Sequence, residues 1–360
     1  MSADIEHALE LAREGPFAAR TSDLHFESDQ APWHRIDGRM LRMDLPPVAG
    51  DSIRGFCEAY FGKRDYERLN GNHGSADGAL HHPRYGAIRL HAFRGDGGIA
   101  LSLRLLSSGV PSLESLGLPP VVASFADFPS GLVLFTGPTG SGKSTALAAL
   151  INEINRKHAR HIVTVEDPIE YRHRSVKSLI RQREIGRDGT SYGESLRGVL
   201  RADPDVILIG ELRDAEVMSA CLQASETGHL VLSTLHTSEA AETVARIVGV
   251  FEGGRQEQVR MQLAQSLQAI VSMRLVPDAS GRGRRAACEL LLNSPAVRSQ
   301  LASPERALQI RNTIETSRKD GMQTLEMDLS RLVSERLVTY EAALSASDYP
   351  EQIRVAAGIR

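Results

Sequence analysis

The pattern of apolar and polar positions divides the chain into two regions that meet between residues 107 and 130. Residues 5–14 place apolar side chains at helical spacing, and Gly15-Pro16 predicts the end of that helix. Short runs typical of strands follow in the first region. From Gly131 onward, apolar runs alternate with helical patterns, which predicts a parallel sheet wrapped by helices.

The first region is predicted to be rich in β-structure. The expected strands cover 22–26, 33–36, 39–45, 87–93 and 99–106, with a helix over 51–61. Asp37-Gly38 and Gly95-Asp96-Gly97-Gly98 are turn sequences between these runs. Four prolines within residues 107–130 indicate a linker with one short helix. We therefore expect domains over 1–108 and 131–360, joined by a linker over 109–130.

Composition and charge narrow the class of protein. Hydrophobic residues make up 41% of the 360 residues and charged residues 24%, as in ordinary globular proteins. A formal net charge of −3 provides no overall field for holding nucleic acid or anionic lipid. The cysteines Cys57, Cys221 and Cys288 form no CxxC pair, which disfavours a disulfide framework or a cysteine zinc site. The start of the chain lacks an apolar signal segment and no stretch approaches about 18 apolar residues, so we expect a cytoplasmic location.

A phosphate-binding loop is the strongest chemical signal. The apolar strand Gly131–Thr136 runs into GPTGSGKST, and a helical pattern begins at about Lys143. Glycines let successive backbone N–H groups converge on phosphates at a helix N-terminus, where a lysine adds positive charge and a serine hydroxyl can bind Mg²⁺. The sequence therefore predicts ATP and Mg²⁺ as ligands, held by Gly137, Pro138, Thr139, Gly140, Ser141, Gly142, Lys143, Ser144 and Thr145.

Acidic residues follow two later apolar strands. Asp205–Glu211 reads as a buried parallel strand whose carboxyl end delivers Glu211, a candidate ligand of Mg²⁺ or of its water shell. A second strand, His161–Val165, precedes Glu166-Asp167-Pro168-Ile169-Glu170. One carboxylate of this acidic loop is a candidate general base for the attacking water. The spacing of Glu166 and Glu170 does not choose between them.

Two histidines bracket a third apolar strand. His229 precedes the run Leu-Val-Leu-Ser-Thr-Leu and His236 follows it. We expect both to lie at the sheet edge that carries Glu211, where they could sense the γ-phosphate and relay its loss. The alternative is that each histidine is structural.

Together these segments resemble the PilT-type pilus retraction ATPases of the secretion ATPase superfamily. The motifs that carry the resemblance are GPTGSGKST, VEDPIEY at 165–171, ILIGELRD at 207–214 and ETGHLVLSTLHT at 226–237. The N-terminal stretches SDLHF and RIDGRMLRMDLPP, and GMQTLE near the C-terminus, also resemble this family. The resemblance covers most of the chain.

The resemblance implies a fold, an assembly and residue roles. It implies an α/β RecA-like ATPase core with a parallel sheet, preceded by a smaller α+β PAS-like domain. It also implies a homo-hexamer that works on a platform protein at the cytoplasmic face of the inner membrane, with twitching motility as the process. In such rings N-terminal arginines reach the nucleotide, and Arg89 and Arg104 occupy matching positions. Glu170 becomes the favoured group for activating water, Glu211 the Walker B acid, and His229 and His236 the sensing positions.

Two stretches depart from the family pattern. The turn 95–98 lacks an arginine that the family often has there and leaves only Arg94 nearby, and AVRSQLAS at 296–303 lacks the final charged pair of the segment linked to retraction. An accessory or regulatory paralogue in a pilus or secretion ATPase ring is therefore an alternative. A DNA-translocating or conjugation motor is another, although Arg-Gly-Arg-Arg at 282–285 is too short to form a basic stripe.

Overall fold

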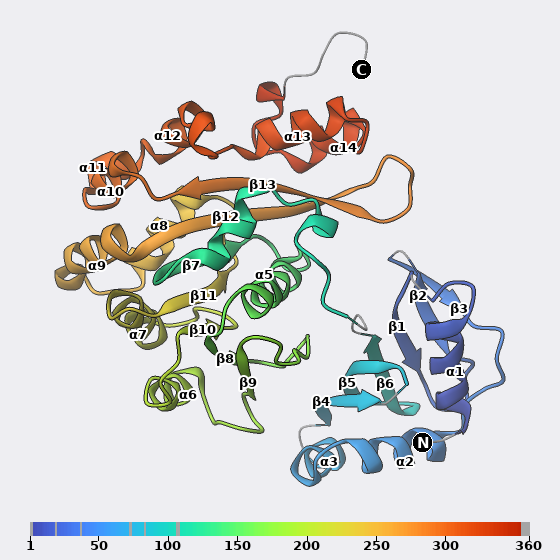
Figure 1. The fold of residues 1–360 in the computed structure, drawn as a ribbon. Coiled ribbons are helices and arrows are strands. Elements are labelled where there is room, and N and C mark those ends of the chain that lie inside the picture. Colours follow the sequence, from blue (N-terminus) through green and yellow to red (C-terminus); the bar gives the residue numbers. More distant parts are fainter. Residues whose placement is uncertain are drawn as a thin grey trace. The chain divides into compact units, whose positions relative to one another are not determined.

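The computed structural model describes residues 3–18, 20–36, 38–71, 74–82, 84–105 and 109–353. These residues divide into two compact units, Met1–Gly109 and Val110–Arg360 (Figure 1). The boundary falls at the start of the predicted linker. Among the described residues, no helix is both long enough and apolar enough to cross a membrane.

Unit 1 is built on an antiparallel sheet. In the described part of this unit, six strands lie in the order β3-β2-β1-β6-β5-β4. Its core includes Leu9, Phe26, Phe56 and Leu90, contributed by both helices and strands. The elements are α1 Ala3–Glu14, β1 Thr21–Phe26, β2 Trp33–Ile36, β3 Arg39–Arg42, α2 Gly50–Tyr60, α3 Lys63–Asn70, β4 Ser75–His82, β5 Gly86–Gly95 and β6 Gly98–Leu105.

Most predicted elements of unit 1 are present, with differences at polar segments. The strand expected over 39–45 ends at Arg42, because Arg42 pairs with Trp33, the first residue of the partner strand β2. The sequence analysis missed α3, and it missed β4 because SADGALHH has no clear apolar alternation. Asp37 of the predicted turn and Leu106 of the predicted last strand lie outside the described residues.

Unit 2 is built on a mixed sheet. Within residues 109–353, seven strands lie in the order β13-β12-β7-β11-β10-β8-β9. Neighbouring strands are parallel except for the pair β12 and β13. The predicted parallel sheet is present, and β13 is an addition to it that forms an antiparallel hairpin with β12 at the edge of the sheet. The strands are β7 Gly131–Thr136, β8 His161–Glu166, β9 Leu179–Glu184, β10 Val206–Ile209, β11 Leu230–Leu235, β12 Leu267–Pro277 and β13 Arg284–Leu292.

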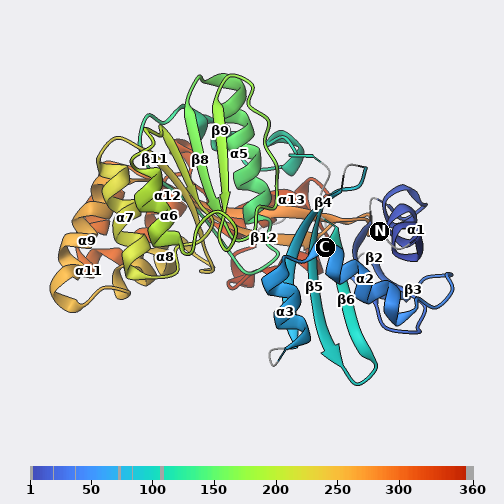
Figure 2. The same cartoon turned by 90° about the horizontal axis from the view of Figure 1, so that it is seen from below.

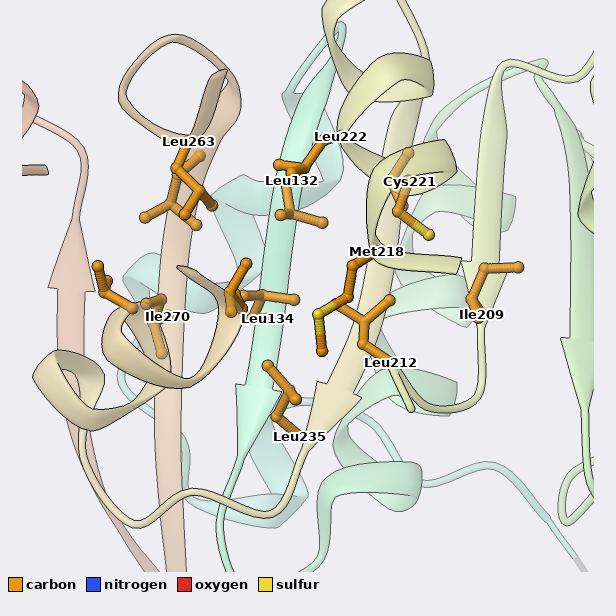
Figure 3. Close-up of a cluster of buried hydrophobic side chains, with 14 of the residues drawn as sticks. Leu132, Leu134, Ile209, Leu212, Met218, Cys221, Leu222, Leu235, Leu263 and Ile270 are labelled. Atoms are coloured by element: carbon orange, nitrogen blue, oxygen red, sulfur yellow. The ribbon is translucent and has the colours of Figure 1, made fainter. Parts of the chain in front are cut away.

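Helices cover both faces of this sheet (Figures 1 and 2). Side chains alternate between faces along β7: Leu132 and Leu134 pack on one side, and Val133 and Phe135 on the other. Figure 3 shows Leu132 and Leu134 beside Met218 and Leu222 of α7. The helices are α4 Val121–Ser124, α5 Lys143–Lys157, α6 Tyr192–Val199, α7 Ala215–Glu226, α8 Ala240–Gly249, α9 Gly253–Ser266, α10 Pro295–Leu301, α11 Pro304–Ala307, α12 Ile310–Thr316, α13 Leu325–Ser334 and α14 Tyr340–Ala346.

The segment expected to be a linker belongs to unit 2 from Val110 onward. It contains α4 and the short 3₁₀ turns Glu114–Leu116 and Phe125–Asp127. Val122 and Phe125 are fully buried in the same core as α5. Burial of these apolar side chains groups the segment with the core of unit 2.

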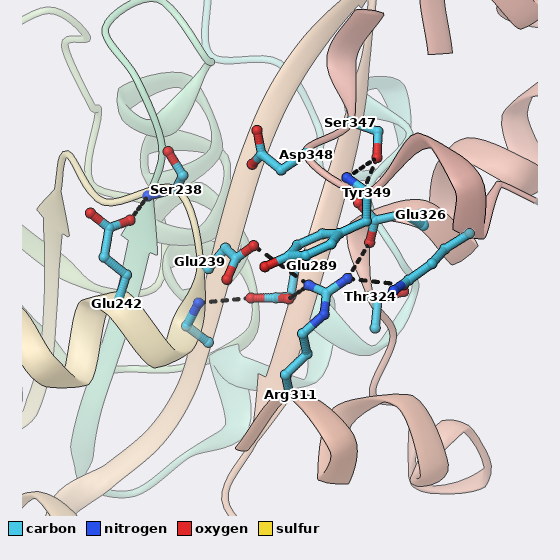
Figure 4. Close-up of polar contacts among 12 residues, drawn as sticks. Ser238, Glu239, Glu242, Glu289, Arg311, Thr324, Glu326, Ser347, Asp348 and Tyr349 are labelled. Atoms are coloured by element: carbon cyan, nitrogen blue, oxygen red, sulfur yellow. Dashed lines mark hydrogen bonds and ion pairs between the residues drawn. The ribbon is translucent and has the colours of Figure 1, made fainter. Parts of the chain in front are cut away.

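A buried ionic cluster joins the C-terminal helices to the sheet (Figure 4). Arg311 of α12 lies 2.9 Å from Glu326 of α13, 3.5 Å from Glu239 before α8, and 3.9 Å from Glu289 of β13. Its guanidinium carbon lies 3.8 Å from the ring centroid of Tyr349. Glu289 and Glu326 are almost fully buried, and burial raises the pKa of Glu289 to about 7.

Candidate nucleotide site

The loop between β7 and α5 has the geometry of a phosphate cradle. Gly142 caps the N-terminus of α5 with a φ of 95°, and Gly137 has a φ of 136°. A Cβ at residue 137 would lie 2.3 Å from the carbonyl oxygen of Met273. Only glycine combines this conformation with this close approach, so the loop can turn its N–H groups toward an anion.

Lys143 lies at the first turn of α5 and is 8% exposed. Its Nζ donates to the carbonyl oxygens of Gly137 at 2.6 Å and Pro138 at 3.0 Å. Burial lowers the pKa of Lys143, while the charges of Glu211 and Glu170 oppose that shift. The nearly buried Lys143 is therefore influenced by the charges of Glu211, which follows β10, and of Glu170, in the loop after β8.

A cavity of about 230 Å³ opens beside Lys143 and is lined by eight of the sixteen predicted site residues. The carboxyl ends of β8, β10 and β11 meet there because these strands are parallel. Its lining includes the sequence-predicted residues Thr139, Gly140, Lys143, Ser144, Glu166, Glu170, Glu211 and His236. The structure thus brings together residues that are more than ninety positions apart.

Glu211 is held by two cationic or titratable partners. One carboxylate oxygen lies 3.2 Å from Nε2 of His236, and the other accepts from Nε of Arg213 at 2.8 Å. Arg213 also lies 3.6 Å from Asp167 and over the ring of Tyr192. The hydrogen bond to Glu211 raises the pKa of Arg213. The sequence analysis assigned no role to Arg213, although it lies inside the quoted motif ILIGELRD.

Glu166 and Glu170 occupy different environments. Oε1 of Glu166 accepts from Thr164 Oγ1 at 2.6 Å and from Gln182 Nε2 at 3.2 Å. Burial raises the pKa of Glu166 to about 6. Glu170 lines the cavity, and its charge acts on Lys143. The structure therefore distinguishes Glu166 from Glu170, which the sequence spacing left as equal candidates for the general base.

The predicted placement of His229 is wrong. β11 runs parallel to β7 with Leu230 opposite Gly131 and Leu235 opposite Thr136, so His229 precedes the strand and His236 follows it. Six residues of strand span roughly 20 Å, which puts His229 at the edge opposite the phosphate loop. Its ring Nδ1 lies 3.0 Å from the carbonyl oxygen of Ala224, a local contact at the end of α7.

The two candidate arginines of unit 1 are neighbours on adjacent strands. Arg89 of β5 and Arg104 of β6 are directly paired across the sheet and exposed. Arg104 donates to Asp23 at 2.9 Å. Arg94, before the glycine-rich turn, donates to Asn70 at 3.2 Å. Their role toward a neighbouring subunit stays a prediction.

Comparisons with known proteins place the chain in a family. A family model described as "Type II/IV secretion system protein" matches residues 94–349. The type IV pilus retraction ATPase PilT of Pseudomonas aeruginosa is 40% identical, over 92% of this chain and 95% of that protein. A twitching motility protein of Neisseria gonorrhoeae is 41% identical, over 93% of this chain and 89% of that protein.

A solved structure agrees with these relatives. The crystal structure of the pilus retraction motor PilT with bound ADP matches with a TM-score of 0.86 and 37% identity, over 96% of this chain and 98% of that chain. This match confirms the predicted α/β core preceded by a smaller domain. The resemblance inferred from the motifs is likewise confirmed. The chain belongs to the type II/IV secretion system protein family and is a homologue of its PilT-type ATPases.

Proposed function

We propose that this chain is a motor ATPase whose homo-hexamer couples ATP hydrolysis to pilus retraction. The observation that carries the proposal is one cavity in which Lys143, Glu170 and Glu211 meet beside a glycine-shaped phosphate loop. The names of the relatives, a retraction ATPase and a twitching motility protein, support the mechanical role. We further propose that the ring works at the cytoplasmic face of the inner membrane on a platform protein.

Each of these residues has a separate role in ATP hydrolysis. Backbone N–H groups of residues 139–145 bind the phosphates, and Lys143 offsets charge on the β- and γ-phosphates. Glu170 orients the attacking water and accepts its proton. His236, in contact with Glu211, couples the state of the site to the segment that enters α8. The transferred phosphoryl group carries spread negative charge, so positioning and electrostatic stabilisation supply most of the catalysis.

Mg²⁺ fits the donor set of the cavity. Ser144 offers an exposed hydroxyl and Glu211 a carboxylate, both on the cavity wall. Among the described residues, no group of three or more His, Cys, Asp or Glu side chains is arranged to hold a metal ion. One hydroxyl and one carboxylate suit an ion such as Mg²⁺, which takes its other ligands from phosphates and water. Ser144 and Glu211 would hold Mg²⁺, and the ion when bound would offset negative charge on the phosphates.

Glu170 is the proposed base because Glu166 is already engaged. The hydroxyl of Thr164 and the amide of Gln182 both donate to one oxygen of Glu166, and the side chain is largely buried. A carboxylate held in this way stabilises the loop around it. Glu170 lines the same cavity as Lys143 and Glu211, and its charge acts on Lys143.

Glu170→Gln is expected to lower kcat by roughly 10²–10⁴-fold while the affinity for ADP stays within about threefold of wild type. The amide keeps the shape of the side chain and cannot accept the proton of water. Steady-state ATP turnover and equilibrium binding of a fluorescent ADP analogue measure the two quantities. Glu166→Gln serves as the matched control, and the assignment fails if that variant loses more turnover than Glu170→Gln.

The retraction role is tested in the source organism. Deleting the gene is expected to leave pili on the cell surface and to abolish twitching, and complementation with Lys143→Ala should not restore movement. Loss of surface pili in the deletion strain would instead indicate an assembly role.

An accessory ATPase is a second candidate, because the turn Gly95–Gly98 lacks an arginine and Arg94 is bound to Asn70. Turnover by the purified chain alone separates the two functions. A retraction motor hydrolyses ATP by itself, whereas an accessory subunit needs a paralogous ATPase.

A further inference from the structure

Gln182 holds the acidic loop from outside the cavity. It lies on β9, the last strand of the sheet order, directly opposite Thr164 of β8. Its Nε2 donates to the carbonyl oxygen of Tyr171 at 2.8 Å and to Oε1 of Glu166 at 3.2 Å. Its Oε1 accepts from the backbone N–H of His173 at 2.9 Å. One amide thus contacts the loop near both of its ends.

The partners fix which way round this amide lies. A backbone N–H only donates and a backbone carbonyl only accepts, so His173 must face Oε1 and Tyr171 must face Nε2. The second hydrogen of Nε2 is then directed to Glu166. No flipped orientation satisfies these partners, which makes glutamine at this position chemically specific.

The loop that Gln182 holds also contacts the first turn of α5, next to the phosphate-binding loop. The hydroxyl of Tyr171 lies 2.9 Å from Oγ1 of Thr145, on the first turn of α5. Glu184, two positions along β9, accepts from the backbone N–H of Ile169 at 3.0 Å. Glu170 lies between Ile169 and Tyr171. Both neighbours are hydrogen-bonded to β9, Ile169 through Glu184 and Tyr171 through Gln182.

We propose that Gln182 is a positioning residue for ATP hydrolysis, which sets the location of Glu170 by fixing the loop on either side of it. The proposal rests on the proposed function, because it assumes that Glu170 acts on water. Misplacing a catalytic group by about 1 Å can cost roughly 100-fold in rate, so a residue outside the cavity can have a large effect. Nucleotide binding depends on the loop 137–145 and should change little.

Asn155 provides a matched control. It is a buried amide on α5 that holds the next stretch of chain in the same manner, donating to the carbonyl oxygen of Arg174 at 2.8 Å. Its Oδ1 accepts from the backbone N–H groups of Val176 at 2.9 Å and Ser178 at 3.3 Å. The bonds of Asn155 do not include residues 166–173. Its replacement tests whether loss of any loop-holding amide lowers turnover.

The experiment compares Gln182→Met, Gln182→Glu and Asn155→Leu in the full chain. We expect Gln182→Met to lower kcat by roughly 10- to 100-fold, with ADP affinity within about threefold of wild type. Asn155→Leu should lower the melting temperature and keep kcat within about threefold. The inference is overturned if Gln182→Met keeps the kcat of wild type, or if Asn155→Leu loses as much.

Gln182→Glu adds a second readout, the pH dependence of activity, which loss of packing alone would not change. The new carboxylate keeps the acceptor for His173 but faces Glu166, with Glu170 nearby, and has no hydrogen to donate. Uptake of one proton restores a donor, so activity relative to wild type should rise as pH falls from 8 to 6, and Gln182→Met should show no such recovery. Equal pH profiles for the two variants would contradict the proposal. If wild type itself does not hydrolyse ATP, the proposed function fails first.

Discussion

Lys143→Ala is expected to abolish measurable ATP turnover, with a fall of at least roughly 100-fold in kcat. The substitution removes the nearly buried cation that interacts electrostatically with Glu211 and Glu170 and leaves those carboxylates without it. It also removes the charge that offsets the transferring phosphoryl group. Phosphate release under saturating ATP and Mg²⁺ measures the effect.

The control for this variant is on the same helix. Lys157 lies in the last turn of α5, is 40% exposed and pairs with Glu153 at 3.2 Å. Lys157→Ala should leave turnover within about twofold, because an exposed ion pair contributes little and lies outside the cavity. Full turnover in Lys143→Ala would remove the basis of the motor assignment.

Arg311→Ala is expected to cost about 3 kcal/mol or more of unfolding free energy. The variant leaves Glu289 and Glu326 buried without their shared cation, and it removes the contact with the ring of Tyr349. Breaking a buried ion pair from one side is strongly destabilising because the remaining charge is uncompensated. Denaturant-induced unfolding, followed by fluorescence, measures the change.

Arg197→Ala is the comparison for this prediction. Arg197 pairs with Glu216 on the surface of the same unit, and both side chains are more than half exposed. Its loss should change the unfolding free energy by less than about 1 kcal/mol. Arg311→Lys should fall between the two variants, because it keeps the charge and loses the planar fork. If Arg311→Ala unfolds like Arg197→Ala, the cluster does not stabilise the C-terminal helices.

The parts of the site that were predictable from sequence are local in the chain. The strand, glycine loop and helix around Lys143 are contiguous, and Glu211 directly follows an apolar run. The direction of a parallel strand decides which of its ends meets the phosphate loop. The prediction for His229 treated both ends of β11 alike, and the register shows that only His236 is at the correct edge.

Contacts between distant segments could not be read from the sequence. Gln182 lies in LIRQRE, an edge strand with charged residues and little apolar alternation, and nothing local connects it to Tyr171. Arg311 is one of many arginines until folding places it beside Glu239, Glu289 and Glu326. The return of β13 beside β12 was missed for the same reason, since αβ alternation alone predicts only parallel neighbours.

The separate cores of the two units have a consequence for calorimetry. The apolar cluster around Phe26 and Phe56 contains only residues 5–105, and the clusters of the second unit begin at Leu113. Each unit therefore has its own source of cooperativity, and one melting temperature cannot describe the whole polypeptide. An endotherm should resolve into two components, of which substitutions such as Arg311→Ala move one. The transition of the other unit should keep its melting temperature and so provide an internal reference in every sample.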